Sequence, residues 1–221
     1  MGLPSISAYT LDAPPPTINR TAWPLAPDRA MLLIHDLQNH FVDVFDRTPS
    51  SQINHAIERT ADLMHASRVA GVPIVYTAQP PAQHPADRRL LTDFWGTGPQ
   101  SATAAAIIDE LSPQPDDTIL TKWRYSAFHR SDLLDRLRNY GRDQLIITGI
   151  YSHIGCMTTA LNAFMHDIQV FFVADAQADF SLEDHQMALK YVGSRCGQVM
   201  TSAQILDSLA PLCSATGGAT V

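Results

Sequence analysis

Short apolar segments recur along the chain, each bounded by turn-forming residues. Each is rich in Val, Ile, Leu or Phe, a pattern typical of strands that are covered on both faces. The segments are Ala30–His35, Val72–Thr77, Thr118–Thr121, Gln144–Ile150 and Val170–Ala174. We interpret them as buried parallel strands. None approaches the roughly 20 apolar residues that cross a bilayer, so we expect no membrane span.

Between these segments lie stretches whose apolar residues repeat near the helical period of 3.6. The predicted helices are Gln52–Ala70, Asp132–Tyr140, Met157–His166 and Leu182–Cys196. Ser50 and Ser51 can cap the first helix, while Gly71 and Gly141 can end the first and second. Alternating strands and helices predict an α/β fold: a three-layer, doubly wound, Rossmann-like and mainly parallel sheet with helices on both faces.

The chain has 221 residues, a length that fits one domain. We divide it into a proline-rich N-terminal arm (1–28), a folded domain (29–208) and a flexible tail (209–221). The arm contains Pro14, Pro15 and Pro16, and we expect it to lie extended on the domain or on a neighbour without carrying chemistry.

Composition and charge narrow the function classes. The formal net charge of -7 disfavours general binding to nucleic acid, although local cations can still bind small anions. Three widely spaced cysteines, Cys156, Cys196 and Cys213, form no C-x-x-C pair, which argues against a disulfide framework or a thiolate zinc site. The N-terminus lacks the charge and apolar pattern of a secretion signal. We therefore expect a cytoplasmic protein.

Polar side chains follow several predicted strands where these strands end. Ligands of open parallel sheets bind outside the carboxyl ends of the strands, which makes these residues candidates for a site. They are Asp36, Gln79, Lys122 and Tyr151. Each also has a purely structural interpretation, because such an aspartate often caps a helix and a lone lysine is usually solvated or ion-paired.

The long connection QPPAQHPADRRLLTDFW, residues 79–95, suits a lid over an anion, since it carries Arg88 and Arg89. The alternative is a surface loop whose Phe94 and Trp95 pack against the core. Histidines stand too far apart to form a recognisable metal motif, which favours core or surface roles. These histidines are His35, His153 and His185. We predict no metal and no other cofactor.

Six segments taken together resemble the isochorismatase family, within a superfamily of cysteine hydrolases. They are MLLIHDLQNHF, TAQP, DFWG, LTKWRYSAFHRSDL, QLIITGIYSHIGCMTTALNAFMHDI and VADAQADFSLEDH. The resemblance extends from about Trp23 to Leu206. The stretches TKWRYSAF and GIYSHIGCMTTA are similar to true isochorismatases of siderophore pathways and to their phenazine-pathway relatives. The resemblance implies that residues 29–208 form an isochorismatase-like hydrolase domain.

This sequence departs from the amidases of the superfamily at the position of their nucleophile. Those enzymes use an Asp–Lys–Cys triad, and counting from Gly149 places their cysteine at Gly155. Cys156 lies one residue later, and one residue at the start of a helix rotates a side chain by about 100°. We therefore expect Cys156 to point away from Asp36 and Lys122. The Asp-x-His metal motif of nicotinamidase-type relatives is replaced here by FVDVFDRTP.

The resemblance implies hydrolysis of the enolpyruvyl vinyl ether of isochorismate, a small anionic substrate. Asp36 would protonate the terminal methylene carbon, and water would capture the resulting oxocarbenium ion without a covalent intermediate. We expect Lys122 to serve mainly the substrate carboxylate and to pair with Asp36 only partly. The remaining implied roles are carboxylate and hydroxyl binding by Gln79, Arg88 and Tyr151, ring contacts by Phe41 and Trp95, and a backbone N–H from Gly155.

Three alternatives remain open. The same chemistry can act on 2-amino-2-deoxyisochorismate, as in phenazine-type biosynthesis. A thiol amidase would use Cys156 as its nucleophile. A non-catalytic scaffold module would use neither the Asp36 acid nor the Cys156 thiol. Choosing Arg88 over Arg89 depends on register alone. The resemblance further implies a homodimer and a cis peptide bond between Ile150 and Tyr151.

Overall fold

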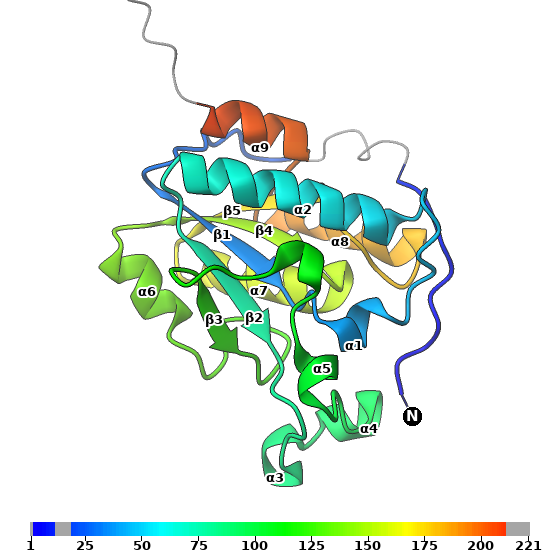
Figure 1. Cartoon of the computed structure of the whole chain (residues 1–221). Coiled ribbons are helices and arrows are strands. Elements are labelled where there is room, and N and C mark those ends of the chain that lie inside the picture. The colour runs from blue at the N-terminus through cyan, green and yellow to red at the C-terminus, as the bar shows by residue number, and fades with distance from the viewer. Residues whose placement is uncertain (1, 12–18, 211–221) are drawn as a thin grey trace, which may run out of the picture.

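A computed structural model describes residues 2–11 and 19–210 of the chain, and a six-stranded sheet forms its centre (Figure 1). The strands are β1 (Ala30–His35), β2 (Ile74–Ala78), β3 (Thr118–Thr121), β4 (Gln144–Gly149), β5 (Gln169–Gln177) and β6 (Gln198–Met200). Their order is β3-β2-β1-β4-β5-β6, and every neighbouring pair is parallel. The predicted doubly wound α/β fold is therefore confirmed.

The strand order reverses direction between β1 and β4. The chain first builds outward from β1 to β2 and β3, then crosses back to place β4 on the other side of β1. Loops that leave β1 and β4 at this point diverge, and a crevice opens at the carboxyl ends of the two strands. The topology thus fixes where the site lies.

Helices cover both faces of the sheet (Figure 1). One face carries α2 (Gln52–Val69) and α9 (Ser202–Leu209), and the other carries α6 (Leu133–Asn139), α7 (Met157–Met165) and α8 (Leu182–Arg195). Alternation along β1 explains the two cores. Leu32 and Ile34 pack into the α2 side, whereas Met31 and Leu33 pack into the other side.

Short helices follow the carboxyl ends of β1 and β2 on the side of the crevice. They are α1 (Asn39–Val42), α3 (Pro85–Arg88), α4 (Leu91–Trp95) and α5 (Ala102–Ala105), followed by a 3-10 turn at Asp109–Leu111. A π-helical turn, Ser152–Cys156, leads from β4 into α7. None of these short elements was predicted, because four or five residues carry too little periodicity to distinguish a helix from a loop.

The predicted strands and long helices are all present, with shifts at their ends of up to three residues. Gly71 and Gly141 end α2 and α6 with φ values of 67° and 64°, as predicted. Ser51 is the N-cap of α2, but its side chain makes no capping hydrogen bond. Strand β6 and helix α9 were missed. Leu209, which we had placed in the tail, ends α9 and is buried, and residues 211–221 lie outside the described part.

The described parts of the N-terminal arm pack against the chain's own domain. Ile6 is buried and pairs with the segment around Phe45, and Leu3 reaches the crevice at the end of the sheet. The arm thus lies on the domain, as expected, and contributes an apolar side chain to the lining of the pocket, whereas the absence of chemistry in the arm stays a prediction. Within the described residues, no helix has the length and apolar character needed to cross a membrane.

Candidate active site

A pocket opens at the carboxyl ends of β1 and β4, where the strand order reverses. It contains about 560 Å³ of space free of protein atoms, part of it open to solvent. Its lining is Leu3, Asp36, His40, Phe41, Gln79, Arg88, Leu91, Trp95, Lys122, Arg124, Tyr125, Ile150, Tyr151, Ile154, Gly155 and Phe180. All eight residues predicted for the site are in this set, and the pocket brings them together from four segments, those that follow β1, β2, β3 and β4.

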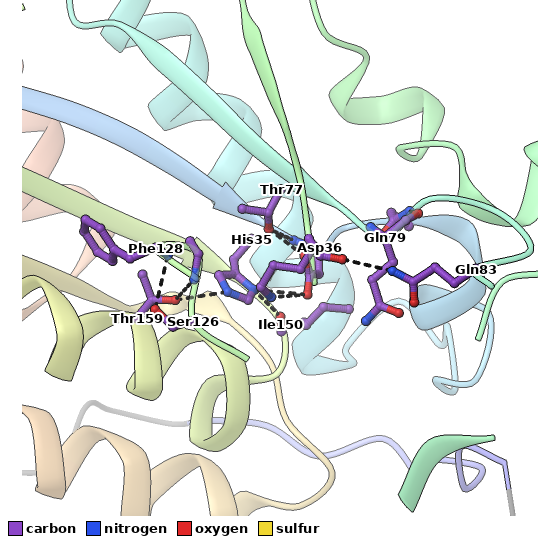
Figure 2. A network of polar contacts seen from close by, with 12 residues as sticks. His35, Asp36, Thr77, Gln79, Gln83, Ser126, Phe128, Ile150 and Thr159 are labelled. Atoms are coloured by element: carbon purple, nitrogen blue, oxygen red, sulfur yellow. Dashed lines mark hydrogen bonds and ion pairs between the residues drawn. The ribbon is translucent and has the colours of Figure 1, made fainter. Parts of the chain in front are cut away.

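Asp36 is held in place from both of its carboxylate oxygens. It follows β1 directly, and its backbone adopts φ 51°, a region that Asp tolerates better than most residues. Thr77 donates its hydroxyl to Oδ1 at 2.5 Å, and Lys122 donates Nζ to Oδ2 at 2.7 Å. The side chain is 11% exposed, on the pocket side. Figure 2 shows the Asp36 carboxylate beside Thr77.

Lys122 is buried and directly paired with Asp36. It follows β3, and its backbone N–H bonds to the Ala78 carbonyl at 2.8 Å, which extends the pairing of β2 and β3 by one residue. We had expected only a partial pairing, with the ammonium serving mainly the substrate. In the ligand-free chain the ammonium pairs with Asp36, because a buried ammonium without a partner costs several kcal/mol. Its division between Asp36 and a bound substrate stays a prediction.

Arg88 brings a second cation to the pocket, held by neutral partners. Its guanidinium donates to the side chains of Gln79 and Gln83 at 3.0 and 3.1 Å and to the carbonyl of Gly96. Burial, helped by nearby Arg124, lowers the pKa of Arg88 from its ordinary value. No carboxylate pairs with Arg88 in the described chain, so its charge is available to an anion in the pocket.

Arg89 behaves differently from its neighbour. Its side chain is exposed, and its Nε bonds to the Ala86 carbonyl at 2.8 Å. Arg88 lines the pocket and Arg89 does not, which favours Arg88 as the anion-binding residue, and that role stays a prediction. The lid segment folds as α3 and α4. Trp95 lines the pocket, while Phe94 is 63% exposed and packs into neither core.

Aromatic rings line much of the pocket. The Tyr151 ring contacts Phe180 with centroids 4.5 Å apart, and Phe41 with centroids 6.3 Å apart. Phe180 also contacts Trp95 at 5.7 Å, and the Trp95 indole donates to the Tyr125 hydroxyl at 2.9 Å. These contacts bring together rings from the five segments that follow β1 to β5 and give the pocket a broad apolar surface.

The residues that follow β4 complete this lining. The peptide bond between Ile150 and Tyr151 is cis, as predicted. The Tyr151 hydroxyl donates to the Phe41 carbonyl at 3.2 Å, so in the ligand-free chain it is engaged with the backbone. Gly155 lies in the π-helical turn and lines the pocket.

A family model for the isochorismatase domain matches residues 30–204, most of the chain. The chain belongs to the isochorismatase family. The isochorismatase of Bacillus subtilis is 51% identical over 216 residues, which cover 95% of this chain and 67% of that protein. The phenazine biosynthesis protein PhzD of Pseudomonas fluorescens is 44% identical over 210 residues, 93% of this chain and 99% of that protein. The chain is thus a hydrolase of the isochorismatase type.

A solved structure shares the fold of this isochorismatase family member. A cysteine hydrolase of Pseudomonas syringae pv. phaseolicola 1448A superposes with a TM-score of 0.77 and 23% identity, covering 88% of this chain and 97% of that one. At this identity the likeness concerns the fold alone.

Cys156 is separated from the pocket, although Gly155 beside it lines the pocket. The Cys156 side chain is fully buried in the core between the sheet and α7, and burial raises the pKa of its thiol well above the ordinary value. Cys156 is absent from the described lining of the pocket, and its orientation away from Asp36 and Lys122 stays a prediction. A buried thiol of raised pKa forms little thiolate, which is the reactive form.

The histidines that the sequence left unassigned have distinct surroundings. His35 is fully buried, and burial together with the positive charge of Lys122 lowers its pKa to about 4. The pKa of His153 is raised although burial opposes this, because the ring bonds to Asp179 at 2.6 Å. Within the described residues, no three His, Cys, Asp or Glu side chains gather as metal ligands would. The absence of a metal stays a prediction.

Sequence reasoning missed several residues of the pocket. Arg124 stands two residues after Lys122, so its proximity to a predicted site residue was the available signal. His40 likewise lies one residue before Phe41. Nothing local pointed to Leu3 or Phe180, because each lies in a loop far from the other site residues in sequence.

Proposed function

We propose that this chain hydrolyses isochorismate to pyruvate and 2,3-dihydro-2,3-dihydroxybenzoate. One observation carries the proposal: Asp36 is the sole carboxyl group among the described residues that line the pocket, and the other charged groups there are the cations Arg88, Lys122 and Arg124. A substrate with two carboxylates matches the cations, and an acid-sensitive vinyl ether needs one positioned acid.

In the proposed mechanism Asp36 transfers a proton to the terminal methylene carbon of the enolpyruvyl group. The carbon gains a C–H bond, and the positive charge develops as an oxocarbenium ion at the ether carbon. Water adds to that carbon and releases a proton, which restores the acid. The hemiketal then breaks its C–O bond to give pyruvate and the diol. The reaction consumes one water and requires no covalent intermediate.

Lys122 is the proton donor that contacts the catalytic carboxyl group. Its ammonium donates a hydrogen bond to Asp36 Oδ2 at 2.7 Å. An anionic substrate beside Arg88 and Arg124 adds negative charge near Asp36 and favours the protonated carboxyl.

The binding roles follow the two walls of the pocket. We assign the substrate carboxylates to Arg88 and Gln79, and a carboxylate or hydroxyl to Tyr151 after its hydroxyl leaves the Phe41 carbonyl. Phe41 and Trp95 cover the ring. Gly155 lines the pocket, and we assign its backbone N–H to a substrate oxygen.

Isochorismate is favoured over 2-amino-2-deoxyisochorismate by the charges of the lining. The amine of the second compound is cationic at neutral pH and needs an anionic partner. Among the described lining residues the carboxylate available is Asp36, which Lys122 already engages. A hydroxyl group at the same place needs only neutral hydrogen-bond partners, which the pocket supplies.

The other two alternatives are less well supported. A thiol amidase would need a nucleophile at the pocket, whereas Cys156 is buried in the core with a raised pKa. A scaffold module would need no acid, whereas Asp36 is fixed through both carboxylate oxygens and still reaches the pocket. We therefore infer a site without a catalytic cysteine.

Release of pyruvate separates these functions. Purified protein is incubated with isochorismate, and pyruvate is followed with lactate dehydrogenase and NADH. We expect pyruvate and the dihydrodiol in equal amounts, and slower turnover of the amino analogue. Release of ammonia from amide substrates, without pyruvate from isochorismate, would establish the amidase function. If none of these compounds were turned over, the scaffold function would be the one supported.

We also propose that the chain acts as a homodimer in the cytoplasm, in siderophore or related secondary-metabolite biosynthesis. Exposed apolar side chains near the adjacent helices α7 and α8, namely Phe164, Met165, Met187 and Tyr191, support association. Light scattering at micromolar concentration should give twice the chain mass. A monomer at that concentration would contradict the assembly but not the reaction.

A further inference from the structure

His35 occupies a buried position directly behind the site, and both of its ring nitrogens are engaged. Nδ1 lies 2.9 Å from the Ile150 carbonyl oxygen, which only accepts, so Nδ1 carries the proton. In the neutral ring Nε2 then accepts from the Thr159 hydroxyl at 3.3 Å, and that hydroxyl accepts from the Ala127 N–H. Figure 2 shows His35 between Thr159 and Asp36. The ring therefore has one fixed orientation.

This ring fills the space that a side chain at position 155 would need. A Cβ added to Gly155 would lie 2.2 Å from His35 Cε1 and 3.0 Å from both ring nitrogens. Contacts under 3.0 Å require something to move. His35 is fully buried and bonded at both nitrogens, so the ring cannot turn aside without losing these hydrogen bonds.

We propose that His35 is the positioning residue of this site, and that its ring keeps position 155 free of a side chain beside Asp36 and Lys122. Its Nδ1 also lies 3.6 Å from Asp36 Oδ2, so one ring borders the acid, the Ile150 carbonyl and the turn at Gly155. The functional consequence rests on the proposed acid mechanism. A thiol at position 155 requires a second change at position 35, and His35 thereby commits the site to acid chemistry.

The chain offers a matched set of variants for a test. Gly155→Ala adds the clashing Cβ, and His35→Asn keeps a donor near the Ile150 carbonyl while removing Cε1, the nearest atom. Gly197→Ala is the control, because its added Cβ would meet Val192 and Val170 instead of His35. We measure thermal unfolding of the three single variants and of two double variants, in which Gly155→Ala or Gly197→Ala is combined with His35→Asn. The measurement needs no substrate, so its outcome is independent of the proposed function.

We expect Gly155→Ala to lower Tm by about 4–10 °C in the wild-type background, as overpacking does. In the His35→Asn background the same change should lower Tm by less than half as much. Gly197→Ala should lower Tm equally in both backgrounds. Equal losses for Gly155→Ala in both backgrounds would overturn the proposal, as would a Gly155→Ala variant as stable as the wild type.

A second measurement tests whether a side chain at position 155 reaches the pocket, which a change in stability alone does not show. It also covers the case in which Gly155→Ala does not fold. Gly155→Cys combined with His35→Asn should present a thiol at the pocket, and iodoacetamide should alkylate it at least tenfold faster than buried Cys156, as followed by peptide mass spectrometry. Equally slow alkylation of the introduced thiol would overturn the proposal. For folded variants, kcat for pyruvate release should fall at least tenfold in Gly155→Ala and recover in the double variant, and an unrecovered kcat would contradict positioning.

Discussion

The two walls of the pocket differ sharply in chemistry although they enclose the same space. The wall built by β1, β2, β3 and their loops supplies the charged groups Asp36, Arg88, Lys122 and Arg124. The wall built by β4, β5 and the N-terminal arm supplies Leu3 and further uncharged residues. These are Ile150, Tyr151, Ile154, Gly155 and Phe180. The first wall also carries the rings Phe41, Trp95 and Tyr125, so the switch point joins a half that holds all the charged side chains to a half without charged side chains.

This division fits a reaction that protonates carbon. Charges on one wall hold the anionic substrate and the acid, and their mutual attraction is stronger when the other wall excludes water. A pocket lined by charges on both sides would keep more water beside the acid. The contrast predicts that substitutions in the charged wall abolish turnover or substrate binding. Substitutions in the apolar wall should reduce both by smaller factors.

The largest effect is expected from Asp36→Asn on the charged wall. The amide keeps the size of the side chain but has no transferable acid proton, so turnover should fall by about 10²–10⁴-fold. Quenching of tryptophan fluorescence, with Trp95 in the pocket, should still report substrate binding. Retention of more than a tenth of wild-type turnover would disprove the role of Asp36.

Arg88→Lys tests anion binding on the same wall. The change keeps the charge but loses the planar donors that meet Gln79, Gln83 and Gly96. We expect KM to rise by about 10–100-fold with kcat changed much less, as for a loss of charged hydrogen bonds. Arg89→Lys, on the exposed neighbour, is the matched control and should leave KM unchanged. Equal effects of the two variants would refute the assignment.

Phe180→Ala tests the apolar wall. The ring contacts Tyr151, Trp95 and His153, so its loss should open the pocket to water and lower kcat/KM by about tenfold. Phe94→Ala removes an exposed ring near Trp95 and should change kcat/KM little. A Phe180→Ala variant with wild-type kcat/KM would remove the apolar wall from the mechanism.

The histidines near the pocket should affect the pH dependence of stability in opposite directions. The pKa values of buried His35 and His185 are lowered to about 4, so the unfolded chain binds more protons between about pH 6.5 and 4. Their contribution to stability is complete above pH 6.5 and is lost as pH falls. The pKa of His153 is raised, so its pair with Asp179 stabilises at low pH and weakens as pH rises.

The lowered pKa values of three histidines, His35, His40 and His185, against the raised pKa of His153 should make the free energy of unfolding smaller at pH 5 than at pH 7. Urea titrations at the two pH values measure this difference. His35→Asn should reduce the difference, and His153→Asn should increase it. An unchanged difference in both variants would contradict the assigned shifts.

Cys156→Ala should have the smallest effect. The thiol packs in the core and does not line the pocket, so the change should cost at most about 1–2 kcal/mol of stability. At least a third of the wild-type pyruvate release should remain. A loss beyond a hundredfold in folded protein would restore the amidase interpretation.

Much of the fold could be predicted from local patterns. The strand Ala30–His35 was predicted to the residue, because six consecutive apolar or buried positions end at a charged one. Helix α7 began at Met157 as predicted, since its apolar period is strong. Strand β6 has three residues and helix α1 has four, and segments of that length carry no periodicity that could be recognised.

The sequence by itself determined the parallel α/β sheet, the polar residues at the strand ends and the absence of a side chain at Gly155. These are local properties, since period, chain direction and residue type are fixed within a few residues. Only the tertiary structure decided that Leu3 and Phe180 join the pocket, that Lys122 pairs directly with Asp36, and that the His35 ring fills the space at Gly155. Such contacts join segments up to about 180 residues apart in the sequence, and packing in three dimensions alone sets which side chains meet.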